Sequence, residues 1–103
     1  AGTTVLVAEQ EGCLAASCTL SVIPNLTRNC RPYALIENVV TLAGHRRRGL
    51  GRQVLRAALD RAWAAGCYKV MLATGSRQEA TLRFYEGAGF ARGGKTYFEA
   101  RRP

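Results

Sequence analysis

The stretch "GHRRRGLGR" at residues 44–52 stands between a strand-like segment and a helix-like segment. After its two glycines, Gly49 and Gly51, apolar residues recur at spacings of three and four, which predicts an amphipathic helix over about residues 50–65. A helix start leaves backbone N–H groups without partners and carries a partial positive charge, so a glycine turn leading into it is suited to bind a phosphate. The stretch therefore predicts an anion site at a strand-to-helix turn.

Upstream of this turn, the sequence has the pattern of three strands. Residues 3–10 and 13–23 are rich in β-branched and apolar side chains and are separated by a short turn with a glycine, which predicts a hairpin. Residues 24–32 have the composition of a loop, and residues 33–41 are again strand-like. We expect these three strands to form an antiparallel sheet.

Downstream, Gly66 is placed to end the first helix, and residues 67–74 form a short apolar run that predicts a buried strand. A second helix is expected from about residue 75 to residue 86 or beyond, and a closing hairpin over residues 89–100. The element order is then β-β-β-α-β-α-β-β. This is an α/β fold with a mixed, mostly antiparallel sheet, in which a β-α-β crossover places the helix start at the carboxyl end of the third strand.

Composition fits one soluble domain over residues 1–103, with 48% hydrophobic and 21% charged residues. No apolar run approaches the ~20 residues of a membrane span, and the first residues do not resemble a signal peptide, so we expect a cytoplasmic protein without a membrane partner. Four cysteines without C-x-x-C spacing and a single histidine predict reduced thiols and no metal site. The net charge of +8 predicts an acidic partner: nucleic acid, a membrane surface or a polyphosphate cofactor.

Two known phosphate loops do not match residues 44–52. A Walker A motif needs Lys and then Ser or Thr after its second glycine, and a dinucleotide fingerprint needs a third glycine at Val54. What is present is Arg46-x-x-Gly49-x-Gly51 directly after a strand, followed later by "ATLRFYEGAGF" at residues 80–90. Together these motifs resemble the GNAT superfamily of acyl-CoA-dependent N-acetyltransferases, and the resemblance runs from about residue 3 to the end of the chain.

This resemblance implies the GNAT-like acyl-CoA N-acyltransferase fold, with acetyl-CoA as cosubstrate and no metal. In the family, the pyrophosphate of coenzyme A binds at the glycine turn, and the pantetheine arm pairs with the backbone of the preceding strand. The cofactor-binding residues implied for this chain are Val39, Val40, Thr41, Arg46, Arg47, Arg48, Gly49, Leu50, Gly51 and Arg52.

The resemblance also implies two catalytic residues. Tyr85 in the "FYE" of the second helix corresponds to the family's tyrosine that protonates the departing thiolate, and Glu37 to a strand glutamate that takes a proton from the amine or attracts it. From the alternation of a regular strand, Glu37 is expected to share a face with Val39 and Thr41. Asn38 is a candidate for orienting the substrate. The alternatives are a packing role for Tyr85 and a solvent-exposed or salt-bridged Glu37.

Family members usually begin with a strand and two helices before the hairpin that opens this chain. The domain is therefore expected to be amino-terminally shortened. A sheet without those covering helices would expose apolar surface, which favours a homodimer, a missing segment or marginal stability.

The favoured function is transfer of an acetyl group from acetyl-CoA to a primary amine by direct attack in a ternary complex. One alternative is a GNAT-like module that binds acyl-CoA without turnover. A second alternative is a basic nucleic-acid-binding domain that uses residues 45–52 and Arg101-Arg102 to contact phosphates.

Overall fold

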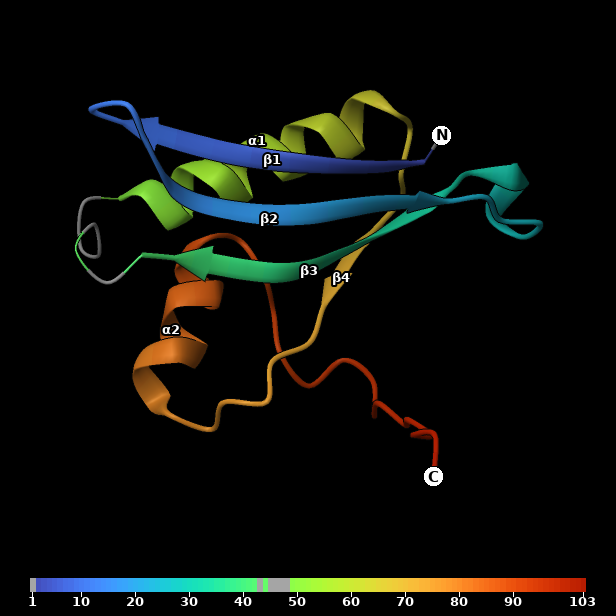
Figure 1. Cartoon of the computed structure of the whole chain (residues 1–103). Coiled ribbons are helices and arrows are strands. Elements are labelled where there is room, and N and C mark those ends of the chain that lie inside the picture. Colours follow the sequence, from blue (N-terminus) through green and yellow to red (C-terminus); the bar gives the residue numbers. More distant parts are fainter. Residues whose placement is uncertain (1, 43, 45–48) are drawn as a thin grey trace.

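The computed structural model describes residues 2–42, 44 and 49–103. A four-stranded sheet carries the long helix α1 along one face, and the shorter helix α2 lies near the start of α1 (Figure 1). The elements in chain order are β1 (Thr3–Gln10), β2 (Cys13–Ile23), the short 3-10 turn η1 (Arg28–Cys30), β3 (Tyr33–Thr41), α1 (Leu50–Ala64), β4 (Val70–Leu72) and α2 (Glu79–Gly87).

The sheet has the order β1-β2-β3-β4. Its first two pairings are antiparallel and the pairing of β3 with β4 is parallel, so the predicted mixed, mostly antiparallel sheet is confirmed. Glu11 and Gly12 connect β1 to β2 with φ values of 53° and 78°. Two consecutive left-handed residues are what a two-residue hairpin turn with the natural strand twist requires, and the predicted hairpin is present.

The core lies between α1 and the sheet. Helix α1 buries Leu55, Ala58 and Ala62 from a face spaced at three and four residues, as the sequence pattern predicts. The sheet contributes alternate residues of its middle strands, above all Leu20 and Ile36, which are among the largest fully buried side chains. This packing fixes the start of α1 beside the carboxyl end of β3.

An extra residue, Asn38, interrupts the pairing of β3 with β2. Thr19 pairs with Glu37 and Ser17 pairs with Val40, so β3 uses one residue more than β2 between these pairs. Asn38 accommodates the bulge in a left-handed conformation, with φ 55°.

The bulge reverses which side chains face α1. Val39 packs against the core and Thr41 contacts the start of α1, whereas Glu37 and Val40 are exposed on the opposite face of the sheet. The expectation that Glu37 shares a face with Val39 and Thr41 is therefore wrong, because regular alternation does not continue through a bulge.

The closing hairpin predicted over residues 89–100 is also wrong. No strand follows α2 in the described residues, and the carboxyl-terminal tail ends away from the sheet (Figure 1). The tail leaves Tyr97 and Phe98 exposed, at 67% and 88% of their surface. Strand β4 is only three residues long and half-buried, shorter and less buried than predicted, so it offers little edge to a further strand. A two-stranded ribbon alone would bury too little apolar surface to be stable.

Candidate functional site

Strands β3 and β4 pair over three residues; β4 ends with this ladder, and β3 continues past it, which leaves an opening beside β3. Their ladder ends at Ile36 and Leu72. From Glu37 to Thr41, β3 remains paired with β2 on one side, but in the described part of the chain no strand continues the ladder on its β4 side. Unpaired N–H and C=O groups on a strand edge bind an extended ligand as an additional strand would. The opening therefore suits a thin, extended ligand that ends near α1.

The glycine turn stands where α1 begins. Gly49 is the N-cap of α1, with φ 76° and ψ 7°, a conformation that strains any residue with a Cβ except Asn and Asp. The N–H of Gln53 donates to the carbonyl of Gly49 at 3.0 Å, so the N–H groups of residues 50–52 precede the hydrogen-bond ladder of the helix. This geometry suits an anion. The predicted contacts Arg46, Arg47 and Arg48 lie outside the described residues.

A shallow hollow of about 520 Å³ opens beside this turn on the outer face of α1. It is lined by Gly49, Arg52, Gln53, Arg56, Ala57 and Asp60. Arg52 and Arg56 lie one helical turn apart on the exposed side of α1, so they add positive charge next to the unpaired N–H groups. The hollow extends the anion-binding region along the helix.

Gly51, the second glycine of the motif, has a different environment from Gly49. A Cβ at Gly51 would lie 3.0 Å from Thr41 Oγ1 and 3.2 Å from Phe84 Cζ, both closer than an ordinary van der Waals contact. The packing between β3, α1 and α2 is therefore tight at this position, and a side chain here would have to displace its neighbours. Sequence reasoning explained this glycine only by ligand approach, because nothing in the local motif indicates the contact with α2.

Tyr85 lies on α2 and packs against the core, half-buried. Its ring meets Phe84 edge-on at 5.2 Å between centroids, and Phe90 edge-on at 6.4 Å. Burial raises the pKa of the Tyr85 phenol above its usual value, because the charged phenolate is poorly solvated there. Tyr85 is therefore neutral at pH 7, as a tyrosine of ordinary pKa would be, and its hydroxyl can donate a hydrogen bond or a proton.

Glu37 and Asn38 are exposed on β3 at the point where the strand leaves β4. The tail passes near them. Tyr97 donates a hydrogen bond to Glu99 at 2.7 Å, which raises the pKa of Tyr97, and the charge of Glu37 makes a smaller contribution in the same direction. Glu37 thus faces the open side of the sheet, away from α1, while Tyr85 packs on the core side.

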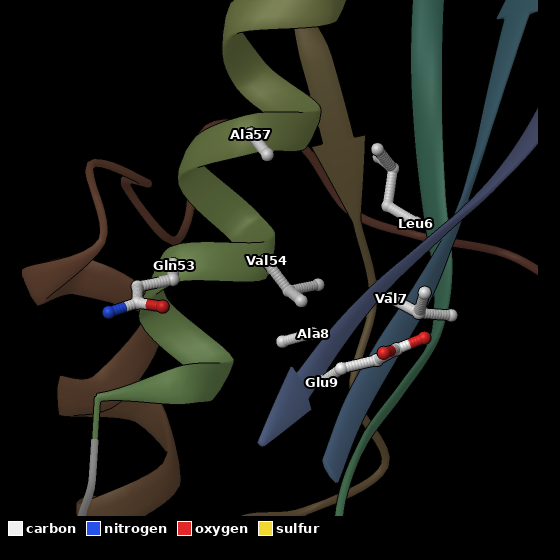
Figure 2. Close-up of a pocket in the computed structure, with 7 residues that line it drawn as sticks. All are labelled: Leu6, Val7, Ala8, Glu9, Gln53, Val54 and Ala57. Carbon is white, nitrogen blue, oxygen red and sulfur yellow. The ribbon is translucent and has the colours of Figure 1, made fainter. Parts of the chain in front are cut away.

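A second groove, of about 280 Å³, lies between β1 and α1 (Figure 2). It is lined by Leu6, Val7, Ala8, Glu9, Gln53, Val54 and Ala57. None of the predicted site residues lines this groove, and Glu9 is its only titratable side chain. It has no set of groups that could carry out proton transfer, so we place the candidate site at the opening between β3 and β4.

The described residues hold no group of three or more His, Cys, Asp or Glu side chains that could bind a metal. All four cysteines are free thiols. Among the helices described, none combines the length and the apolar character needed to cross a membrane.

Comparison with known proteins agrees with this geometry. The model of the acetyltransferase (GNAT) family matches residues 1–90. The chain belongs to the GNAT family. A putative acetyltransferase from Agrobacterium tumefaciens of known structure is 51% identical, with a TM-score of 0.94 over 99% of this chain and 70% of its own. This likeness places the GNAT fold on nearly the whole chain.

Two GNAT relatives carry the same name. The glucosamine 6-phosphate N-acetyltransferase of Trypanosoma brucei brucei is 34% identical over 88 residues, which are 85% of this chain and 58% of that protein. The crystal structure of the Arabidopsis thaliana glucosamine-6-phosphate N-acetyltransferase is 28% identical, with a TM-score of 0.86 over 98% of this chain and 67% of its own. The chain thus spans under two thirds of the length of the trypanosome relative.

Proposed function

We propose that this GNAT chain is an N-acetyltransferase that moves an acetyl group from acetyl-CoA to a primary amine by direct attack in a ternary complex. The observation that carries the proposal is the separation of β3 from β4 directly beside the start of α1. An unpaired strand edge and an unpaired set of helix N–H groups match the two halves of acetyl-CoA, an amide-containing arm and a pyrophosphate.

The residues of the opening supply a candidate contact for each half of acetyl-CoA. In the described part of the chain, no strand pairs with Val39, Val40 and Thr41 on their β4 side, so their backbone would bind the pantetheine arm. The N–H groups of Leu50, Gly51 and Arg52 would hold the pyrophosphate. We retain Arg46, Arg47 and Arg48 as proposed contacts. When bound, acetyl-CoA supplies an activated acyl group in the form of a thioester.

Tyr85 is the proposed proton donor. Its half-buried phenol is held by two aromatic neighbours, and burial raises its pKa further above neutral pH. A positioned neutral phenol can protonate, or hydrogen-bond to, the sulfur of the leaving group. A tyrosine that only packs does not use its hydroxyl group in the reaction. Replacement by phenylalanine, which keeps the ring and removes the hydroxyl, therefore distinguishes the two roles.

Glu37 is the proposed acceptor-side residue. It is exposed on the face opposite α1, so an amine can approach it without passing the core. A carboxylate there attracts an ammonium group and can accept its proton directly or through water. Asn38, next to it on the bulge, is proposed to orient the substrate through its amide.

The acceptor proposed for the first assays is an amino sugar phosphate. Two relatives are named glucosamine 6-phosphate N-acetyltransferases, and the net charge of +8 favours an anionic substrate. Other primary amines, on small molecules or proteins, are alternative acceptors to be assayed alongside it.

We also propose that residues 1–103 form a single domain, and that this domain acts as a cytoplasmic homodimer. The four free cysteines are consistent with a reducing compartment. Val5 and Val7 on the edge strand β1 are 64% and 48% exposed on the sheet face away from α1, an apolar surface that a second copy could cover.

Calorimetric titration with acetyl-CoA tests the site directly. Saturable binding of one molecule per chain is expected, with a tighter constant than for adenosine, which lacks both the pyrophosphate and the pantetheine arm. If acetyl-CoA does not bind while a random DNA duplex binds in a salt-dependent manner, the arginines serve nucleic acid and the proposal is wrong.

A further inference from the structure

The first turn of α1 touches α2 at two points. At the first, Gly51 lies so close to Phe84 that an added Cβ would be 3.2 Å from the ring carbon Cζ. At the second, the Arg52 guanidinium lies against Gly87 in the last turn of α2, where an added Cβ would be 2.6 Å from Nη2. Two consecutive residues of the glycine motif thus contact the helix that carries Tyr85.

Phe84 connects the first of these contacts to Tyr85. The two side chains are adjacent in the sequence, and their rings meet edge-on with an interplanar angle of 65°. Tyr85 is held in turn by Phe90, at 89°. A displacement of Phe84 therefore changes the surroundings of the Tyr85 ring, because packed aromatic rings have little free space between them.

A side chain at residue 51 would also meet a second neighbour, on β3. The same added Cβ would also lie 3.0 Å from Oγ1 of Thr41, a residue of β3 that pairs with β2. Both neighbours are side-chain atoms that must give by a few tenths of an ångström. The backbone of Thr41 is held by its ladder with β2, so we expect Phe84 on α2 to move more.

We propose that Gly51 is a positioning residue for Tyr85: its missing side chain lets Phe84 pack on the first turn of α1 and so fixes Tyr85 relative to the acetyl-CoA turn. This inference rests on the proposed function, in which Tyr85 donates a proton. Arg52 supports the same arrangement from the other end of the contact, since a cation next to the carboxyl end of a helix is electrostatically favourable.

The proposal is tested with Gly51→Ala, Phe84→Leu and the double variant, in which the shorter leucine leaves room for the added methyl group. Tyrosine ring carbons are labelled with ¹³C, and the Tyr85 signal is assigned by its loss in Tyr85→Phe. Gly51→Ala is expected to shift this signal and to lower its titration midpoint towards that of an exposed tyrosine. In the double variant, the signal and its titration midpoint are expected to lie close to those of Phe84→Leu alone.

Turnover and affinity are measured on the same proteins, with acetyl-CoA and glucosamine 6-phosphate. For Gly51→Ala we expect kcat to fall about tenfold, while the Kd for acetyl-CoA stays within about threefold, because misplacement of a proton donor affects the reaction more than binding. In the double variant, kcat should recover to within about threefold of the Phe84→Leu value.

Three results would overturn the inference. One is a Gly51→Ala protein whose Tyr85 signal and kcat are unchanged. Another is a tenfold or greater loss of acetyl-CoA affinity that Phe84→Leu does not relieve, which would assign Gly51 to ligand approach. The third concerns a Gly51→Ala protein that does not fold. In that case, an unchanged Tyr85 signal in Phe84→Leu alone would overturn the inference. Failure of the wild type to bind or use acetyl-CoA would overturn the proposed function, while the NMR comparison would still decide the contact.

Discussion

Thr19 of β2 pairs with Glu37 of β3, and the very next residue of β3, Asn38, has no partner in the ladder. This bulge determines which side chains of β3 face α1 and which face the opposite side of the sheet. It holds Glu37 on the open face of the sheet and turns Val39 and Thr41 towards α1. One extra residue therefore separates the acceptor side of the proposed site from the side where acetyl-CoA would bind.

The bulge depends on the left-handed conformation of Asn38, with φ 55°. A β-branched residue is strained there, so Asn38→Val should lower the free energy of unfolding by about 1–2 kcal/mol. Asn38→Gly is the matched control and should stay within about 0.5 kcal/mol of wild type, since glycine adopts this conformation freely. Urea denaturation measures both. A valine variant as stable as the glycine variant would mean that the ladder has no bulge at this residue.

Gly49 is expected to be required by backbone conformation, in contrast to Gly51. With φ 76° at Gly49, Gly49→Ala should cost about 1 kcal/mol of stability, and Gly49→Asn should cost less because asparagine tolerates this conformation. Among the described residues, no atom lies within 4 Å of a Cβ added at Gly49, so steric conflict with them does not contribute. Equal stability of the alanine and asparagine variants in urea would argue against a left-handed N-cap.

Tyr85→Phe should lower kcat by about 10²-fold and leave the Kd for acetyl-CoA within about threefold. The phenylalanine keeps the edge-on contacts with Phe84 and Phe90 and loses only the hydroxyl group. Steady-state kinetics and calorimetry give the two constants. An unchanged kcat would assign Tyr85 to packing.

The pH profile provides a separate test of Tyr85. Burial raises its pKa above the ordinary value of 10.0, and the neutral form is the proton donor. The wild-type kcat should therefore persist to pH values above 10.0 and fall only as pH rises through the raised pKa. This alkaline limb should be absent from Tyr85→Phe. A limb that remains in the variant would belong to another group.

Glu37→Gln should reduce the rate mostly at low pH. There the amine acceptor is protonated and needs a carboxylate to attract it and take its proton, whereas at high pH the free amine needs neither. Glu9→Gln, an exposed strand glutamate outside the site, is the control and should follow the wild-type profile. A loss that is equal at all pH values would remove the role of a base from Glu37.

Local patterns predicted the elements that local interactions form. Spacings of three and four identified α1, β-branched runs identified β1, β2 and β3, and the two-residue turn between β1 and β2 was evident from Gly12. The glycine motif and the "FYE" of α2 are the two motifs that the sequence assigns to the site. The fold brings them together, since Gly51 contacts Phe84.

What sequence reasoning missed depends on contacts between distant segments. The bulge at Asn38 arises from the register of β3 on β2, which no pattern within β3 encodes. The packing role of Gly51 depends on Phe84, and the absence of the closing hairpin depends on how little edge β4 offers. Each of these features is set by tertiary pairing, so local propensity could not predict it.

The most direct test of the central claim is amine-dependent release of the coenzyme A thiol from acetyl-CoA, with glucosamine 6-phosphate and a panel of other primary amines. We predict release that requires an amine, yields the N-acetylated product and drops about 10²-fold in Tyr85→Phe. Tight binding of acetyl-CoA without acetylation of any amine in the panel would contradict the account and would make the chain an acyl-CoA-binding module.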